Sequence, residues 1–395
     1  MKVLVINSGS SSIKFQLFKM PEQEVVASGL VEKIGLKNGE IHYNTQKKSV
    51  NIEMEISDHA VGLREVVNLL MSSASGVISN VDEIEMIGHR VVHGGKEFLN
   101  TVEINQDVID RIKSLFNLAP LHNPPNHVGI VVAQDIFPNA RQIAVFDTSF
   151  HQTIPEKAHT FAIPLKFRDE HDIRMYGFHG ISHHYVSQKA IEYLHNPSAK
   201  LIVIHLGNGC SMTAIKDGKS IDHSLGFGPN QGLIMGTRSG DIDQAVIFYL
   251  MEKFNMGAQE VSNLLTKQSG MLGLTGDSDL RGIEERANIG DEIAQLALEM
   301  NTYRIKKYIG TYAAVLNGLD AIVFTAGIGE NSELIRAKVC EDMSYFGIEL
   351  DANKNSIRSK EIREISTEYS RTKVLVIPTN EELQIAKECF AFQQK

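Results

Sequence analysis

The chain has 395 residues, which is long enough for two domains with full hydrophobic cores. Its formal net charge of −9 at pH 7 argues against a nucleic acid or an anionic membrane as a partner. Cys210, Cys340 and Cys389 are scattered and odd in number, so they indicate neither a disulfide framework nor a zinc ribbon. Because no run approaches roughly 20 apolar residues and the N-terminal apolar run is too short for a signal peptide, we expect a soluble, cytoplasmic protein.

The first predicted element is a hairpin. Residues 3–6 are apolar and mostly β-branched, which predicts a buried strand. Residues 7–12 are small and polar, so they favour a tight turn with open backbone N–H groups before a second, alternating strand. With Lys14 early in that second strand, the turn can act as a phosphate clamp. A plain hairpin with a polar turn explains this stretch equally well.

A near copy of this pattern opens the second half of the chain. Residues 201–215 predict a strand, a Gly/Asn turn over 207–209 and another strand, and the Asp-Gly pair at 217–218 is a strong hairpin signal. Two such units predict a duplicated domain with two phosphate loops facing a cleft. This layout resembles the actin-like ATPase superfamily.

The rest of the first half alternates between predicted strands and helices. Asp107 and Asn126 are predicted helix N-caps, and a short strand delivers Asp147 at its carboxyl end. In chain order, the expected elements are strands from 25 and over 52–56, a helix over 63–70, a strand over 84–92, helices from 107 and from 126, and a strand over 142–146.

The second half continues the alternation, which predicts an α/β fold. A long glycine-rich loop over 222–240 is expected to be functional. We place the domains at 1–149 and 150–382, with a C-terminal helix over 383–395 joining the first. The later elements are helices over 244–254 and 291–316, a strand over 321–325, a turn over 327–331, a helix from 332, a strand over 374–377 and a helix from 381.

Several loops resemble those of the acetate kinases, in an order and spacing that span nearly the whole chain. The motifs are NSGSSSIKF (7–15), HRVVHGG (89–95), DTSFHQT (147–153), YGFHG (176–180), HLGNG (205–209), MGTRSGD (235–241), SDLRG (278–282), GIGEN (327–331) and PTNEE (378–382). The resemblance implies duplicated actin-like (ribonuclease H-like) domains, with mixed β-sheets flanked by helices and the active site in the interdomain cleft. It also implies reversible, Mg-assisted, direct in-line transfer of the ATP γ-phosphoryl group to acetate, giving acetyl phosphate and ADP.

Three cationic side chains receive roles from this resemblance. Arg90 grips the substrate carboxylate through paired hydrogen bonds. Arg238 and His179 stabilise charge on the transferring phosphoryl group. The ordinary alternative for each is structural, as an ion-paired arginine or a histidine of the fold. His179 and His183 also have the spacing of a zinc pair, but they lack a third ligand at metal-like spacing.

The resemblance further implies Mg²⁺, with Mn²⁺ as an alternative, anchored by Asn7 and Glu381. Neighbouring Glu382 leaves that assignment ambiguous by one position, and Glu381 can equally be an acidic residue favoured in a first helical turn. Asp147 corresponds to the family's active-site aspartate. Because a carboxylate substrate is already ionised near pH 7, we expect Asp147 to orient Mg²⁺-bound water or Arg238 rather than to transfer a proton.

The nucleotide and the acid have their own implied contacts. The GIGEN motif lacks the third glycine of a dinucleotide fingerprint, so an adenosine contact is preferred. The implied ATP-binding residues are Lys14, His205, Leu206, Gly207, Asn208, Gly209, Asp279, Leu280, Arg281, Gly327, Ile328, Gly329, Glu330 and Asn331. The implied pocket for the acid's methyl group consists of Val92, Leu121, Phe178 and Pro229, although each of these can equally be plain core. Around Pro229 the chain reads GPNQG where acetate kinases typically have TPLEG.

Two alternatives stay open. One is another actin-like kinase, for a sugar, propionate or another short-chain or longer fatty acid. The other is a non-catalytic nucleotide switch of the actin or chaperone type, against which Arg90, His179 and Arg238 argue because a switch needs no clamp for a second substrate. The resemblance also implies a homodimer.

Overall fold

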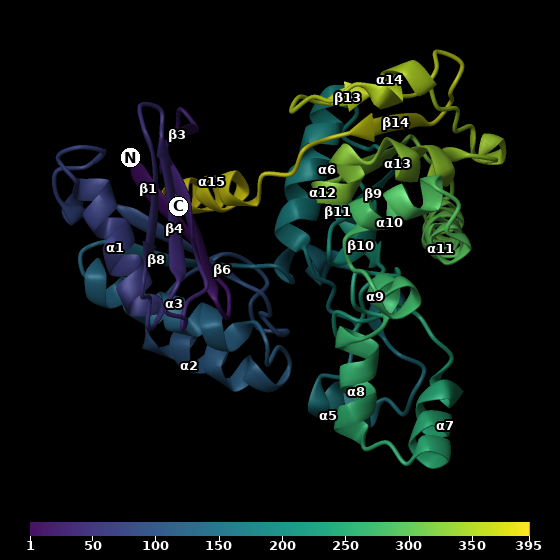
Figure 1. Cartoon of the computed structure of the whole chain (residues 1–395), viewed down its shortest axis with the longest axis horizontal. Helices are drawn as coiled ribbons and strands as arrows, with labels where there is room; N and C mark the ends of the chain where they lie inside the picture. Colours follow the sequence, from purple (N-terminus) through teal and green to yellow (C-terminus); the bar gives the residue numbers. More distant parts are fainter. Residues whose placement is uncertain (395) are drawn as a thin grey trace. The chain divides into compact units, whose positions relative to one another are not determined.

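The computed structural model describes residues 1–394, which divide into two compact units (Figure 1). Unit 1 contains Met1–Phe150, His179–Ile181 and the chain from Asn380 to the end of the described residues. Unit 2 contains His151–Phe178 and Ser182–Thr379. The chain therefore returns to unit 1 with its last helix.

Unit 1 is built on a mixed sheet with the strand order β5-β4-β3-β2-β1-β6-β8-β7. The antiparallel part runs from the β1–β2 hairpin outward, whereas β6 pairs in parallel with both β1 and β8. The strands are β1 (Lys2–Ser8), β2 (Ser12–Lys19), β3 (Glu24–Glu32), β4 (Gly39–Thr45), β5 (Ser49–Met54), β6 (Met86–Val91), β7 (Val102–Glu103) and β8 (Arg141–Phe146).

Alternation along β1 gives the sheet of unit 1 two apolar faces. Leu4 and Ile6 belong to the core that includes residues of α1 (His59–Met71) and α3 (Asn123–Ile136). Val3 and Val5 pack in a second core with α15 (Glu381–Gln393). At Gly88 of β6, a Cβ atom would lie 2.5 Å from the side chain of Ile385, so glycine permits the close approach of α15. A further helix, α2 (Gln106–Ser114), contacts α3.

Unit 2 repeats the strand order of unit 1. Its sheet is β11-β10-β9-β12-β14-β13, and the run β11-β10-β9-β12-β14 corresponds to β3-β2-β1-β6-β8 in position and direction. The predicted duplication is thereby confirmed. The strands are β9 (Leu201–Leu206), β10 (Cys210–Lys216), β11 (Lys219–His223), β12 (Ala321–Thr325), β13 (Arg363–Glu364) and β14 (Lys373–Val376).

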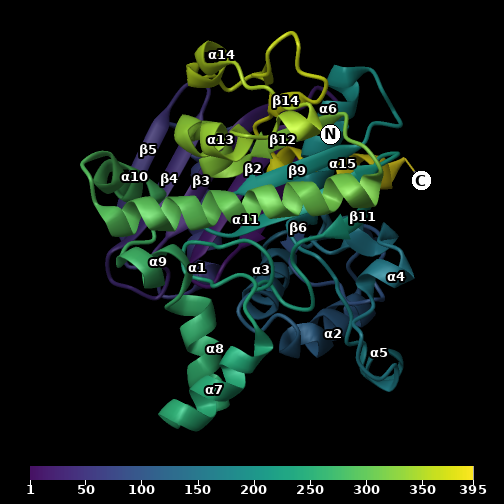
Figure 2. The same ribbon diagram turned by 90° about the vertical axis from the view of Figure 1, so that its right-hand side faces the viewer.

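The helices of unit 2 centre on α11 (Glu292–Leu316), which contacts β9 and β10 and covers one face of the sheet (Figure 2). Helices α7 and α8 extend away from that sheet. The remaining helices are α4 (Glu156–His159), α5 (Lys166–His171), α6 (Gly180–Leu194), α7 (Gln244–Phe254), α8 (Ala258–Lys267), α9 (Gly270–Thr275), α10 (Leu280–Asn288), α12 (Ala326–Asn331), α13 (Glu333–Cys340) and α14 (Ala352–Ser356). Within residues 1–394, none of the helices is both long and apolar enough to cross a membrane.

Three local predictions are wrong. Asn105 rather than Asp107 caps α2, with its side chain accepting the Val108 N–H. Asn126 lies inside α3, because the helix already starts at Asn123 and accommodates the following prolines in its first turn. Residues 327–331 belong to helix α12 instead of a turn. The C-terminal helix predicted over 383–395 is α15, and residue 395 lies outside the described residues.

Candidate active-site residues in the two units

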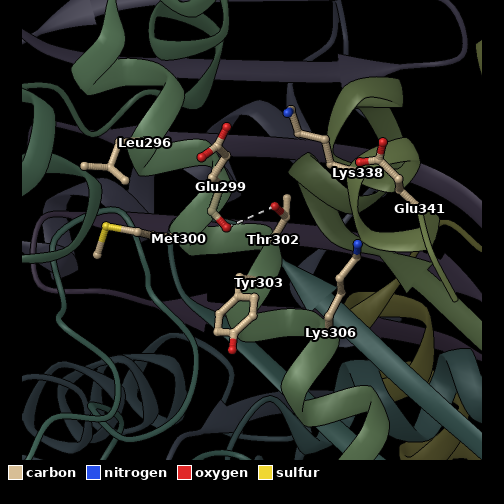
Figure 3. Close-up of a pocket in the computed structure, with 8 residues that line it drawn as sticks. All are labelled: Leu296, Glu299, Met300, Thr302, Tyr303, Lys306, Lys338 and Glu341. Atoms are coloured by element: carbon tan, nitrogen blue, oxygen red, sulfur yellow. Dashed lines mark hydrogen bonds between the residues drawn. The ribbon is translucent and has the colours of Figure 1, made fainter.

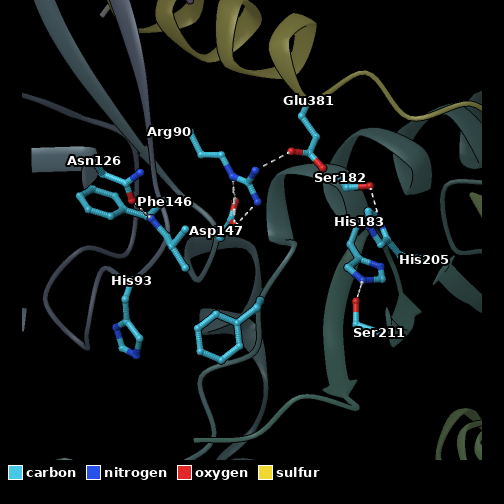
Figure 4. Close-up of polar contacts among 12 residues, drawn as sticks. Arg90, His93, Asn126, Phe146, Asp147, Ser182, His183, His205, Ser211 and Glu381 are labelled. Atoms are coloured by element: carbon cyan, nitrogen blue, oxygen red, sulfur yellow. Dashed lines mark hydrogen bonds and ion pairs between the residues drawn. The ribbon is translucent and has the colours of Figure 1, made fainter. Parts of the chain in front are cut away.

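Arg90 lies at the centre of an ion-pair group in unit 1 (Figure 4). Its Nη2 and Nε donate to the carboxylate of Asp147 at 2.7 and 3.2 Å, and its Nη1 lies 3.3 Å from Glu381 Oε2. Strand β6 supplies Arg90, the end of β8 delivers Asp147, and the first turn of α15 supplies Glu381. The parallel strands β6 and β8 end side by side, which explains why two side chains far apart in sequence meet here.

Burial differs across this ion-pair group. The Asp147 side chain is 2% exposed, whereas those of Arg90 and Glu381 are each 18% exposed. Burial raises the pKa of Asp147, and the Arg90 guanidinium opposes that rise. Burial alone would lower the pKa of Arg90, but the Asp147 and Glu381 carboxylates raise it above its ordinary value. Arg90 is therefore a permanent cation held in a fixed orientation, and it is a partner of Asp147 that the sequence interpretation did not consider.

Glu381 and Glu382 have different surroundings. Lys14 Nζ lies 2.7 Å from Glu382 Oε1, and the Glu382 side chain is only 7% exposed. Glu381 points to Arg90 and keeps more of its surface open. Of the two carboxylates, Glu381 has the larger exposed fraction, 18% against 7% for Glu382. Lys14, an implied phosphate ligand, is 51% exposed in its pair with Glu382.

Two asparagines of α3 tie the loops of unit 1 together. Asn126 accepts the Val92 N–H at 3.1 Å through Oδ1, and its Nδ2 donates to the Ser8 carbonyl at 2.7 Å. Asn123 makes a reciprocal pair of 3.0 Å hydrogen bonds with the backbone of His93. The ends of β1 and β6, which carry Asn7 and Arg90, are thus fixed to one helix. The only sequence signal for this role is the two asparagines flanking the pair of prolines in HNPPN.

His179 occupies a strained position at the start of α6. Its φ of 56° is left-handed, and the neighbouring Gly177 has a φ of 77°. The Gly180 N–H donates to the Asp147 carbonyl at 2.9 Å, and a Cβ atom at Gly180 would lie 2.0 Å from that same oxygen. Glycine at 180 is thus required for the contact that places His179 beside the backbone of Asp147.

Buried histidines surround Phe178 in unit 2. His151 Nε2 lies 3.0 Å from the Phe178 carbonyl, and the Phe178 N–H donates to His223 Nε2 at 3.2 Å. Burial lowers the pKa of His151 to about 4, so His151 contacts this backbone as a neutral imidazole.

The predicted alternative of a zinc pair concerns His179 and His183. His183 Nε2 lies 2.7 Å from Ser211 Oγ, within hydrogen-bonding distance (Figure 4). Among residues 1–394, the one group of side chains with metal-like geometry is Glu32, Glu40 and His42. The structure therefore gives no support to a zinc pair of His179 and His183.

Parts of three implied nucleotide motifs line a single cavity in unit 2. The contributors from the motifs are Leu206 and Gly207, Leu280, and Ile328. Its other lining residues are Cys210, Ile234, Met235, Gly236, Met271, Ser278 and Asn301. Ile234, Met271 and Asn301 were not singled out from the sequence, whereas Met235, Gly236 and Ser278 lie within recognised motifs.

The remaining nucleotide candidates do not line this cavity. His205 Nδ1 lies 2.9 Å from Ser182 Oγ, and the Glu330 side chain accepts the Thr379 N–H at 3.1 Å. Asp279 caps α10 and forms an ion pair with Arg281, which is 87% exposed. A Cβ atom at Gly236 would lie 2.0 Å from Asn208 Oδ1, so the loop that carries Arg238 packs closely on the 207–209 turn only because residue 236 is glycine.

The four implied pocket residues differ in environment. In unit 1, Val92 is half-buried and Leu121 is 60% exposed. In unit 2, Phe178 is 3% exposed and Pro229 is half-buried. The Pro229 carbonyl accepts a 2.9 Å hydrogen bond from Nη1 of Arg238, which links the wall of the implied pocket to the implied catalytic arginine. Burial lowers the pKa of Arg238.

A wider groove of about 470 Å³ lies elsewhere in unit 2 (Figure 3). It is bordered by α11 and α13, and Glu299, Lys306, Lys338 and Glu341 give it charges of both signs. None of the residues implicated by the sequence lines this groove. It is therefore separate from the candidate active site.

The two sheets with a common strand order, each beginning with a hairpin and a polar turn, define a duplicated actin-like α/β protein. The model of the acetokinase family matches residues 2–387. The chain belongs to the acetokinase family.

Individual relatives agree with this membership. The chain is 58% identical to the acetate kinase of Flavobacterium johnsoniae over 390 residues, covering 99% of each. It superimposes on the crystal structure of Porphyromonas gingivalis acetate kinase with a TM-score of 0.94 and 44% identity, covering 99% of each chain. A propionate kinase from Francisella tularensis gives a TM-score of 0.92 and 42% identity, covering 98% of each chain.

Proposed function

We propose that this protein is an acetate kinase, which reversibly transfers the γ-phosphoryl group of ATP to acetate and gives acetyl phosphate and ADP. Family membership supports this reaction, and the observation that carries it is the orientation of Arg90. A guanidinium held by Asp147 and facing Glu381 offers a fixed cation at the end of β6, as recognition of a small carboxylate requires. A nucleotide switch has no need of such a group.

In the proposed mechanism the protein positions the reactants and neutralises charge. Arg90 orients the acetate, whose oxygen attacks the γ-phosphorus in line while the bond to the ADP oxygen breaks. Arg238 and His179 stabilise the charge on the transferring group. The acetate needs no general base because it is already ionised near pH 7. The hydrogen bonds from Arg90 to Asp147 support a role for Asp147 in orienting this arginine rather than in proton transfer.

We assign Mg²⁺, or Mn²⁺ in its place, to Glu381 and Asn7. Both offer the oxygen ligands that Mg²⁺ prefers, and the half-buried Asn7 lies in the last part of β1. When bound, the cation would neutralise phosphate charge. Replacement of Glu381 by glutamine is expected to raise the Mg²⁺ concentration needed for half-maximal activity by about 10-fold or more, because a neutral ligand binds the cation less tightly. The measurement is an Mg²⁺ titration of initial rate at saturating ATP and acetate.

Glu382→Gln is the matched control for this substitution. It removes the partner of Lys14 but leaves Glu381 in place, so the Mg²⁺ requirement should hardly change. If Glu382→Gln shifts the requirement and Glu381→Gln does not, the metal assignment is off by one position.

The choice of acid is proposed to depend on Val92. Valine leaves less room than alanine, so acetate should exceed propionate in kcat/KM by a factor within the range of about 10–200 that one methylene in an apolar pocket provides. Val92→Ala should narrow or reverse that preference. Initial rates with acetate, propionate and butyrate, for the wild-type protein and this variant, test the proposal.

Each outcome of the acid comparison is informative. A higher wild-type kcat/KM for propionate or butyrate than for acetate would contradict the acetate assignment and leave the acyl-phosphate chemistry standing. The likeness to the Francisella propionate kinase and the GPNQG sequence around Pro229 make this comparison necessary. Slow ATP hydrolysis that is indifferent to every acid would favour the nucleotide switch.

We further propose a cytoplasmic homodimer formed through unit 2. Several large apolar side chains on α7 and α11 are exposed to solvent. Monomeric proteins rarely expose large apolar patches. The exposed side chains are Val246, Phe248, Tyr249, Phe254, Ile293, Leu296, Met300 and Tyr303.

The cytoplasmic location is supported by the three free cysteines, which fit a reducing compartment. The dimer is tested by its mass. Light scattering coupled to gel filtration should give twice the chain mass of 43.8 kDa, and a single-chain mass at micromolar concentration would contradict the dimer.

A further inference from the structure

Hydrogen bonds between Gly232 and Asp241 join the two ends of the loop that carries Arg238. It runs between β11 and α7, and within it the Gly232 N–H donates to Asp241 Oδ1 at 2.8 Å while the Asp241 N–H donates to the Gly232 carbonyl at 3.0 Å. Gly232 has a φ of 96°, a conformation that favours glycine. This reciprocal pair of hydrogen bonds turns residues 232–241 into a closed loop with Arg238 near one end.

A polar stripe on α11 holds the ends of this closed loop. Asn301, Arg304 and Tyr308 are spaced by three and four residues, which places them on one face of the helix. Arg304 Nη1 donates to the carbonyls of Gly232 and Asp241 at 2.9 and 3.2 Å. The Tyr308 hydroxyl donates to Asp241 Oδ2 at 2.7 Å, so the two oxygens of one carboxylate connect the helix to the start of the loop.

Asn301 completes the α11 stripe by donating to the Ile234 carbonyl at 3.2 Å. The other side of the closed loop is held by backbone hydrogen bonds and by the Thr237 hydroxyl, which donates to the Thr266 carbonyl at 3.2 Å. The Gly236 N–H donates to the Asn208 carbonyl, and the Met235 N–H donates to the Arg238 carbonyl at 3.1 Å. The α11 stripe therefore holds the ends of the closed loop, whereas Thr237 and the backbone hold its other side.

We propose that Tyr308, acting through Asp241, is a positioning residue for Arg238 and that it sets the rate of phosphoryl transfer without touching either substrate. This inference rests on the proposed role of Arg238. A shift of about 1 Å in a group that must meet the transition state can cost on the order of 10²-fold in rate. The hydrogen bond from Tyr308 to Asp241, which fixes the end of the loop to α11, is therefore expected to affect kcat. Burial, and then the charge of Asp241, raise the pKa of Tyr308, which keeps its hydroxyl protonated as the donor.

The same helix offers a matched control one turn away. Tyr312 lies in edge contact with Tyr308, with ring centroids 5.6 Å apart, and it is 2% exposed. Its hydroxyl is buried without a hydrogen-bond partner in the described structure. Removal of the Tyr312 hydroxyl therefore deletes the same atom from the neighbouring ring without breaking a hydrogen bond to the loop.

The experiment compares Tyr308→Phe, Tyr312→Phe, Arg238→Ala and the double variant Arg238→Ala/Tyr308→Phe in the full-length protein. Tyr308→Phe should lower kcat by roughly 5- to 10²-fold with little change in the KM of either substrate, while Tyr312→Phe should match the wild type. In the Arg238→Ala background, Tyr308→Phe should cause less than about a twofold further loss, because its effect passes through Arg238. Thermal unfolding is recorded for every variant.

The outcomes separate this proposal from the one on which it rests. A kcat for Tyr308→Phe equal to that of Tyr312→Phe, or an equal loss with and without Arg238, would overturn the positioning role. A kcat unchanged by Arg238→Ala would instead overturn the proposed role of Arg238 itself. If Tyr308→Phe lowers the folded yield, Asp241→Asn serves in its place, because its single amide oxygen cannot serve both the Gly232 N–H and Tyr308 as acceptor in the same way, and the same cycle with Arg238 applies.

Discussion

Replacement of Arg238 by alanine is expected to lower kcat by about 10²-fold or more, with much smaller changes in the KM values for acetate and ATP. The reason is that the interaction strengthens only as charge spreads over the transferring phosphoryl group. The guanidinium lies in a buried position, where its Nη1 donates to the Pro229 carbonyl at 2.9 Å. Steady-state kinetics with each substrate varied in turn provide the measurement.

His179→Ala should give the same kind of loss, because His179 is assigned to the same developing charge. Arg64→Ala is the control for removal of an arginine: this side chain is 62% exposed on α1 and forms an ion pair with Asp135 at 3.4 Å. It should leave both kcat and KM unchanged. A loss for Arg238→Ala confined to the KM for acetate would contradict the transition-state role.

Arg90→Ala is expected to raise the KM for acetate by roughly 30-fold or more while changing that for ATP far less, because a charged, paired hydrogen-bonding contact with the carboxylate is lost. The substitution has a second effect. It leaves Asp147 buried without its guanidinium partner, and breaking a buried ion pair in this way costs roughly 3–5 kcal/mol of unfolding free energy. Denaturant unfolding and substrate kinetics on the same preparation measure both effects.

The double variant Arg90→Ala/Asp147→Asn separates stability from binding. Neutralising Asp147 removes the uncompensated charge, so stability should recover while the KM for acetate stays high. An equal loss of affinity for acetate and ATP, relieved together with stability, would mean that Arg90 supports the fold of unit 1 and does not bind the acid.

The duplicated fold could be predicted from sequence because its signals are local. The hairpins beginning at Val3 and Leu201 have alternating apolar residues and small polar turns, and the Asp217-Gly218 turn adopts the left-handed conformation that this pair favours. The helices α7 and α11 also have the limits that their apolar periodicity and caps indicate.

The interpretation failed where tertiary contacts outweigh local propensity. Asn126 has the composition of an N-cap, but its side chain instead joins Ser8 to Val92, which are distant in sequence. The glycines of 327–331 suggest a turn, yet helix α12 forms there, with the buried Arg336 donating to the carbonyls of Gly329 and Glu330.

The sequence indicated which residues to consider for the candidate site, but it did not indicate which of their side chains contact one another. Arg90 and Asp147 belong to separate motifs, and only the parallel register of β6 and β8 brings them together. The sequence could not distinguish Glu381 from Glu382, because the difference between them is the ion pair of Glu382 with Lys14. No local sequence pattern indicates which of the two carboxylates forms that pair. Tyr308 lies on α11, whose sequence pattern indicates only a packed helix. Its hydrogen bond to Asp241 could therefore be recognised only in the folded structure.

The central claim, that acetate accepts the phosphoryl group of ATP, is tested most directly by trapping the product. The protein is incubated with ATP, Mg²⁺, acetate and hydroxylamine, and acetohydroxamate and ADP are quantified in the same samples. The account predicts that the two products form in equal amounts, depend on acetate and fall together in Arg238→Ala. ADP formation without acetohydroxamate, at a rate that acetate does not change, would contradict it.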